Sequence, residues 1–472
     1  MPTLNVRCHL FVLACCFISA YATAQEVVEV EDVFEADHRN GLVMQVEAAI
    51  ASAQADYGVI SRDAADEITR TANTQYASLE EIDAEYEIVR HRMVALLNVW
   101  KRSLSPEAAD SLHLGVTTVD VYDTVLLLQL LESIDMMLAE LLAIEQELAC
   151  LATQHRDTVM IGRTLGQHAL PITFGKKVSV WAAQTRRNID RLYEVRARLR
   201  SSGVLKGAVG SYAGLGESAM DVERSVSSSL GLATPEPADW RPARDVFAEY
   251  AQTLALISKA HAGIGREIFH LQMTDIGEVY ERRQATAVGS STMPHKRNPS
   301  LSEALIFYGR TIPAAADVVL QDVESVFERD NTSRPNRALM DITVDAAIML
   351  KQTKTLLNRL EVNEQRMLAN VDRTDGMVMS QKVMLFLANK ISKEVAEKHV
   401  RAAADVSFGN EISFKDALLS DPLLRPHLEA QIDELLEPEN SLGMASEQVN
   451  ATIDWINTKR LSLNQKPLRD CK

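Results

Sequence analysis

One short segment, residues 287–299, concentrates side chains that can bind or move charge. After Gly289 it carries serines, two cationic side chains, an imidazole and an amide, and it ends at Pro299. Exposed main-chain N–H groups after Gly289, with Lys296 nearby, would suit a carboxylate or a developing negative charge. A serine here could act as a base only if such donors stabilised its alkoxide. The segment therefore indicates either an anion-binding loop or a structural turn.

The elements that must position this loop are predicted to be long helices. Ala, Leu, Glu, Arg, Met and Gln are abundant and strand-like alternation does not persist, which favours a mainly α fold. Four stretches have helical spacing of apolar residues with few Gly or Pro breaks, namely 124–163, 176–202, 244–261 and 338–375. A helix of thirty-odd residues is about 45 Å long, which suits a bundle that other subunits often complete.

The chain of 472 residues is long enough for three structural segments beyond its start. A mixed helical N-terminal domain is predicted over 25–115, and the long helices form a central bundle domain over 116–375. A smaller helical C-terminal domain is predicted over 376–472, where several prolines interrupt the sequence.

The first 24 residues differ from the rest and resemble a secretory signal peptide. Arg7 is their only charge, residues 10–21 are apolar, and Ala22-Thr23-Ala24 is typical of a cleavage site. The apolar run is short for a membrane span. We therefore expect export to the periplasm, whereas a mis-assigned start would leave a cytoplasmic enzyme.

Charge and cysteine content exclude some classes of function. With 49 basic and 65 acidic residues the net charge is −16, which disfavours general affinity for nucleic acid or an anionic membrane. Three of the five cysteines lie in the leader, leaving Cys150 and Cys471, which do not indicate a disulfide framework or a cysteine metal site. The histidines lack metal-ligand spacing, so no metal is expected.

Residues 289–299 resemble the signature loop of the fumarase/aspartase superfamily, Gly-Ser-Ser-x-Met-Pro-x-Lys-x-Asn-Pro, at every fixed position. The resemblance implies that Ser290 abstracts the proton next to a substrate carboxylate, with Ser291 as the second choice. It also implies that Lys296 and Asn298 hold that carboxylate and the negative charge that forms on it.

Two further segments are similar to the other active-site segments of this superfamily. Residues 113–124 resemble the first, whose usual core is Thr-Ser-x-Asp, with Thr118 in place of the serine. Residues 162–171 resemble the second. The resemblance implies that His113, Thr117 and Thr118 bind the substrate.

The combined segments most resemble the adenylosuccinate lyase branch, and then the carboxymuconate cycloisomerases. One departure concerns the general acid, because adenylosuccinate lyases usually have a histidine where this chain has Leu165. His168 is the first candidate for the missing acid and His91 the second. Alternatively, the leaving group needs less help, or the reaction differs.

Several cationic side chains outside these segments could bind a carboxylate or phosphate. Arg329 and Arg334 could do so through bidentate contacts, or they could pair with the acidic surface. His91 could contact the substrate, or with Arg90 and Arg92 it could form a solvated cationic face.

The resemblance implies a lyase that cleaves a C–N bond by β-elimination and releases fumarate from an N-substituted aspartate. The alternatives are a lactonising enzyme of the 3-carboxy-cis,cis-muconate cycloisomerase type and a non-catalytic structural homologue. It further implies a homotetramer with active sites shared between subunits and a small dicarboxylate-type substrate. No cofactor is expected, because the substrate carboxylate delocalises the charge.

Overall fold

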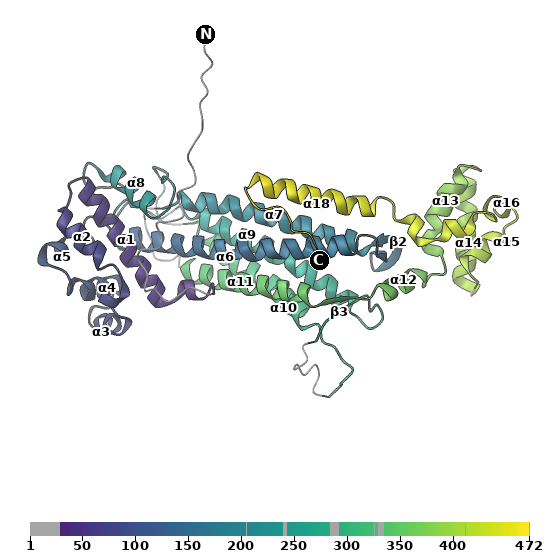
Figure 1. The fold of residues 1–472 in the computed structure, drawn as a ribbon, viewed down its shortest axis with the longest axis horizontal. Helices are drawn as coiled ribbons and strands as arrows, with labels where there is room; N and C mark the ends of the chain where they lie inside the picture. The colour runs from purple at the N-terminus through teal and green to yellow at the C-terminus, as the bar shows by residue number, and fades with distance from the viewer. Residues whose placement is uncertain are drawn as a thin grey trace, which may run out of the picture. The chain divides into compact units, whose positions relative to one another are not determined.

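The computed structural model describes residues 29–203, 205–238, 243–283, 292–324, 326–328, 335–410 and 412–471. These residues are mainly helical (Figure 1), which confirms the predicted fold class. The α-helices are α1 Ala36–Asp56, α2 Arg62–Arg70, α3 Leu79–Val89, α4 Arg92–Lys101, α5 Pro106–Ser111, α6 Thr118–Gln154, α7 Phe174–Arg200, α8 Ala219–Ser229, α9 Asp245–Leu271, α10 Ser300–Gln321, α11 Pro335–Asn358, α12 Glu364–Asp372, α13 Ser380–Ala388, α14 Lys393–Asn410, α15 Phe414–Ser420, α16 Arg425–Leu428, α17 Ile432–Leu436 and α18 Ala445–Ser462.

Two small sheets correct the helix prediction at two places. Strands β1 (Val159–Thr164) and β2 (Gln167–Thr173) form an antiparallel hairpin, so the helix expected over 124–163 ends earlier. Strands β3 (Val279–Glu281) and β4 (Leu360–Val362) also pair antiparallel, and β4 interrupts the helix expected over 338–375. Short strands of this kind carry too few residues for a clear alternation.

The Cα positions divide the chain into two compact units. Unit 1 comprises the described residues of Met1–Met136, Tyr193–Gln252 and Ala315–Val344; unit 2 comprises those of Met137–Leu192, Thr253–Ala314 and Asp345–Lys472. The three-segment division expected from the sequence stays a prediction. None of the described helices has the length and apolar content needed to cross a bilayer.

In unit 1, a core of apolar side chains joins α1, α2, α4 and α8. Trp100 of α4 is fully buried, and its indole N–H donates to Thr71 Oγ1 at 2.9 Å, which satisfies its one polar group. Serine N-caps set the first turns of α2, α3 and α5 because their hydroxyls accept the otherwise unpaired N–H groups there.

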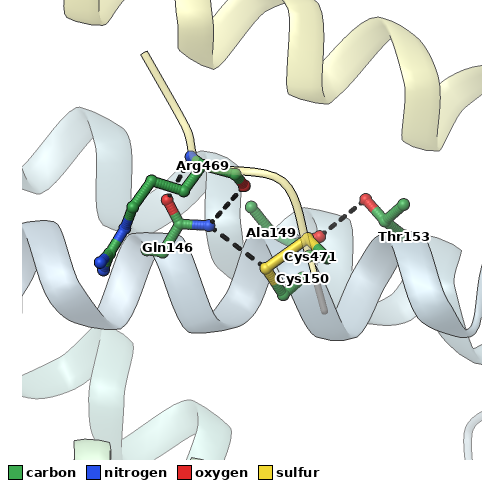
Figure 2. The surroundings of a disulfide bond; sticks show 6 residues. All are labelled: Gln146, Ala149, Cys150, Thr153, Arg469 and Cys471. Carbon is green, nitrogen blue, oxygen red and sulfur yellow. Dashed lines mark hydrogen bonds between the residues drawn. A yellow bond between two sulfur atoms is a disulfide. The ribbon is translucent and has the colours of Figure 1, made fainter. Parts of the chain in front are cut away.

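In unit 2, the C-terminal tail is held against α6 by a disulfide, which corrects the expectation from the cysteine count. Cys150 and Cys471 are bonded with their Cα atoms 5.1 Å apart (Figure 2). Beside them, the Gln146 amide donates to the carbonyl of Arg469 at 3.0 Å and accepts its N–H at 2.8 Å. The sequence count missed this pair because 321 positions separate the two cysteines.

Buried charges fasten the same tail. The Arg186 guanidinium donates to Gln465 Oε1 at 2.9 Å, and Arg460 donates to Glu145 Oε2 at 3.1 Å and to the carbonyl of Lys466 at 2.8 Å. Burial raises the pKa of Glu145 to about 7, although both arginines oppose the shift. The tail is therefore fixed by polar contacts as well as by the covalent bond.

Candidate active site

In unit 1, the segment that resembles the first active-site motif forms a tight turn before α6. His113 has φ of 65° and Gly115 has φ of 74°, both in the left-handed region. A Cβ atom at Gly115 would lie 2.4 Å from the carbonyl oxygen of Gly214, so only glycine allows this approach. Thr117 and Thr118, both half-buried, follow at the start of the helix.

Asp120 joins this turn to the loop at 206–212. Its carboxylate accepts N–H groups of Thr117 and Lys206, each at 2.9 Å, and of Gly207 at 3.1 Å. Asp120 is fully buried, and burial raises its pKa to about 6 even though the three N–H groups favour the charged form. The aspartate of this motif therefore holds two loops together and does not lie open to a substrate.

The 206–212 loop is itself fixed by buried charges. The Lys206 ammonium donates to Glu223 Oε1 at 2.6 Å, and the Tyr212 hydroxyl donates to Glu223 Oε2 at 2.6 Å. The Lys206 side chain is fully buried, so this cation is structural and unavailable to a ligand.

His113 also has a carboxylate partner. Its Nδ1 lies 2.6 Å from Oε1 of Glu47 on α1, and the imidazole is 21% exposed. Burial by itself would lower the pKa of His113, but the hydrogen bond and charge of Glu47 outweigh it, and the pKa is raised. Of the predicted unit 1 residues, His113, Thr117 and Thr118 thus share one rigid turn.

His91, the other predicted residue in unit 1, has a separate structural role. It is exposed at the N-terminus of α4, where its Nδ1 accepts the N–H of Val94 at 3.3 Å. This makes it the N-cap of that helix. The described contacts of His91 include none of the other predicted site residues.

In unit 2, the departure from the adenylosuccinate lyase pattern lies at the tip of the β1–β2 hairpin. Leu165 and Gly166 form a two-residue turn with φ of 52° and 76°, which is the pattern of a type I′ turn. Leu165 is fully exposed in the isolated chain. A non-glycine residue adopts this left-handed backbone conformation only at an energetic cost, which the closed hairpin turn imposes here.

His168, the predicted general acid, lies on β2 opposite Arg163. It is half-buried, and its Nδ1 is buried without a hydrogen-bond partner among the described residues. Partial burial and the charges of Arg163 and Arg373 lower its pKa. At pH 7 the ring is therefore mainly neutral, which suits a proton acceptor better than an acid.

Arg163 of β1 forms a bidentate ion pair with Glu278. Its guanidinium donates to both carboxylate oxygens of Glu278, at 2.6 and 2.9 Å, and Asn370 adds a third bond at 2.7 Å. The Glu278 side chain is fully buried. This bidentate pair fixes β1 against the chain just before β3.

Replacing Arg163 with methionine is expected to lower the free energy of unfolding by about 3–5 kcal/mol, because it leaves the Glu278 carboxylate buried and uncompensated. Urea unfolding would measure the loss. The control is Arg156→Met, which removes an exposed pair with Asp157 and is expected to leave the free energy of unfolding nearly unchanged. Equal effects of the two variants would contradict the assignment.

The described part of the signature loop, from 292 onward, leads into α10. Lys296 and Asn298 are exposed there, and the Lys296 N–H bonds to the carbonyl of Met293 at 3.0 Å. Glu281 accepts the N–H groups of Leu301 and Ser302 at 3.0 and 2.9 Å, which anchors the end of the loop. Lys296 and Asn298 are therefore accessible, and the chain that follows them is anchored by Glu281.

Four predicted residues lie outside the described residues, namely Ser290, Ser291, Arg329 and Arg334. Their roles stay predictions. Sequence reasoning also missed Glu47 and Glu278. A signal existed for Glu47, because it is the only charged residue between Arg39 and Asp56 in an otherwise apolar and small-residue stretch. For Glu278 no local signal distinguishes it from surface acids.

Comparison with known proteins agrees with these motifs. A family model described as lyase matches residues 20–313, and one described as adenylosuccinate lyase C-terminus matches residues 376–452. The chain is 36% identical over 430 residues to N-acetyl-S-(2-succino)cysteine lyase of Dickeya dadantii (strain 3937), covering 90% of this chain and 94% of that protein. The chain belongs to the fumarase/aspartase superfamily of lyases.

The chain is also similar to two proteins of the superfamily whose names give other substrates. Adenylosuccinate lyase of Methanocaldococcus jannaschii is 31% identical over 439 residues, covering 92% of this chain and 94% of that protein. The crystal structure of 3-carboxy-cis,cis-muconate lactonizing enzyme from Pseudomonas putida matches with a TM-score of 0.84 and 28% identity, covering 91% and 97% of the two chains. This protein is therefore a lyase of the superfamily. The names of these relatives give different substrates.

Proposed function

We propose that this lyase cleaves the C–S bond of a 2-succino thioether and releases fumarate and a thiol by β-elimination. A base removes the Cβ proton, the electron pair forms the double bond of fumarate, and the C–S pair leaves on sulfur. The observation that carries the proposal is Leu165, which stands where adenylosuccinate lyases have an acid. A relative that is 36% identical is named as an N-acetyl-S-(2-succino)cysteine lyase, which supports the same substrate class.

The chemistry of the leaving group explains why a leucine is tolerated. A thiol has a pKa of about 8.5, so sulfur can leave as a thiolate without being protonated first. A leaving nitrogen must receive a proton, because its anion is far more basic. A neutral His168 and an apolar Leu165 would therefore slow C–S cleavage less than C–N cleavage.

The other residues act on the carboxylate side of the reaction. Ser290 is the proposed base, and Lys296 and Asn298 would stabilise the charge that builds on the substrate carboxyl group. Thr117 and Thr118 would donate hydroxyl groups to the same carboxylate. We further propose a homotetramer, in which segments of different subunits form each site; light scattering of the purified protein would test its mass.

C–N cleavage of an N-substituted aspartate is the second candidate, because the C-terminal family model and several relatives are those of adenylosuccinate lyases. A spectrophotometric fumarate assay of residues 25–472 separates the two. The substrates are N-acetyl-S-(2-succino)cysteine and adenylosuccinate. Lactonisation of carboxymuconate releases no fumarate, so that alternative is followed separately by the loss of absorbance of carboxymuconate itself. Turnover of adenylosuccinate at a higher kcat/KM than the thioether would overturn the proposal.

Leu165→His is expected to raise kcat/KM for N-substituted aspartates relative to the thioether by about 10-fold or more, because an acid helps only the poorer leaving group. Leu165→Gln is the control, since it is polar but cannot transfer a proton. The two ratios are measured in the same fumarate assay. An equal change in both substrates would show that position 165 does not act on the leaving atom.

We also propose that the enzyme is exported to the periplasm. The leader pattern of residues 1–24 supports this, and the Cys150–Cys471 disulfide supports it independently, because disulfides persist mainly in oxidising compartments. Fractionation with N-terminal sequencing of the mature chain would test it. An uncleaved chain in the cytoplasm with both thiols reduced would contradict it.

A further inference from the structure

The pair formed by Glu47 and His113 is unusual for the degree to which the carboxylate is enclosed. Glu47 is 1% exposed, its Oε1 lies 2.6 Å from His113 Nδ1, and its Oε2 has no hydrogen-bond partner among the residues that the structure describes. A buried carboxylate with a single partner is tolerated when that partner carries the opposite charge. This arrangement favours the imidazolium form of His113.

We propose that Glu47 is a positioning residue that fixes the ring of His113 and keeps it cationic, so that its Nε2–H binds an acid group of the substrate. Nε2 lies across the ring from Nδ1, and within the described part of the chain no hydrogen bond occupies it. The role of His113 as a substrate ligand rests on the proposed function. The inference concerns Glu47, which would act on the substrate only through His113.

Helix α1 holds the turn of His113 at two points. Besides the carboxylate of Glu47, the Gln54 side chain donates to the carbonyl of Leu114 at 2.8 Å, and Gln54 is 2% exposed. These residues are seven positions apart, two turns of one helix, so both face the same side. A rigid helix therefore fixes both the backbone and the ring of this turn.

Three charged groups act on the imidazole of His113. Burial lowers its pKa, Glu47 of α1 and Asp120 of α6 raise it, Lys101 of α4 lowers it, and the net direction is upward. The imidazolium is therefore retained to higher pH than in a free histidine. As the pH rises through the raised pKa, the cation is lost and the substrate dianion binds less well. Without the Glu47 charge, this loss should begin at lower pH.

Glu47→Gln keeps the shape and an acceptor oxygen but removes the charge. The variant is expected to lower the pKa of His113 by at least about one unit, which is a tenfold change in its proton affinity. The pKa is measured from 13C-histidine spectra of the purified enzyme, with His113 assigned through His113→Gln. Succinate is the probe of binding, measured by calorimetry, and its Kd at pH 7.5 is expected to rise about tenfold. In the fumarate assay KM should rise much more than kcat falls.

A second His–Glu pair in unit 1 provides the matched control. His38 lies on α1, the helix that carries Glu47, and its Nε2 lies 2.9 Å from Oε2 of Glu132 on α6. Neither His38 nor Glu132 is a predicted site residue. Glu132→Gln removes the same kind of contact and is expected to leave both the His113 titration and succinate affinity within about twofold of wild type. Glu47→Asp keeps the charge and is expected to retain most of the raised pKa.

The outcomes separate this inference from the proposed function. If wild type turns over none of the substrates, the proposed function fails, while the titration and succinate binding still decide the role of Glu47. If Glu47→Gln folds and leaves the His113 pKa or succinate affinity unchanged, the inference is wrong. If that variant does not fold, a wild-type His113 pKa below the ordinary value for histidine would overturn it alone.

Discussion

Replacing Ser290 with alanine is expected to lower kcat for fumarate release by about 10²–10⁴-fold, because the proposed base for the Cβ proton is removed. KM should change little, since the hydroxyl contributes more to proton transfer than to holding the substrate. The measurement is the fumarate assay on N-acetyl-S-(2-succino)cysteine with residues 25–472. Deuterium at Cβ should slow wild type if proton removal limits the rate.

Ser291→Ala is the matched control, because it removes the same group from the neighbouring position of the Gly-Ser-Ser motif. It is expected to retain activity within about tenfold of wild type. The reverse order, with Ser291→Ala inactive and Ser290→Ala active, would transfer the role of base to the second serine. Full activity of both variants would contradict the prediction that a serine of this loop is the base.

Replacing Cys471 with serine is expected to lower the free energy of unfolding by about 2–5 kcal/mol, because the disulfide restricts the unfolded chain over a long loop. The two bonded cysteines are 321 positions apart, which places this bond at the upper end of that range in the chain-entropy account. Urea unfolding under oxidising conditions measures the loss. The tail contacts of Gln146 and Arg186 persist, so the variant should still fold.

Wild-type protein with added reductant is the control, because it should unfold at the same urea concentration as oxidised Cys471→Ser. The variant itself should be insensitive to reductant. Free thiols should be undetectable in oxidised wild type, since Cys150 and Cys471 are the two cysteines outside the leader. Equal stability of oxidised wild type and the variant would contradict the prediction.

The sequence alone determined the helical fold class and the superfamily. Long stretches with apolar residues three and four positions apart can bury one stripe only in a bundle, and the string from Gly289 to Pro299 is long enough to be specific. The sequence also identified His113, Thr117 and Thr118 as neighbours, because they lie within one turn of chain. The role of Ser290, the residue most important to the proposed chemistry, is a prediction from this motif.

The tertiary structure decided what depends on contacts between distant residues. Glu47 reaches His113 across 66 positions and Arg163 reaches Glu278 across 115, and no local pattern encodes such pairs. The same holds for the disulfide, because the number of cysteines in the sequence does not reveal that Cys150 and Cys471 lie close together. Protonation is decided at this level too: the pKa of His113 is raised and that of His168 is lowered, since burial and neighbouring charges differ around two chemically identical side chains.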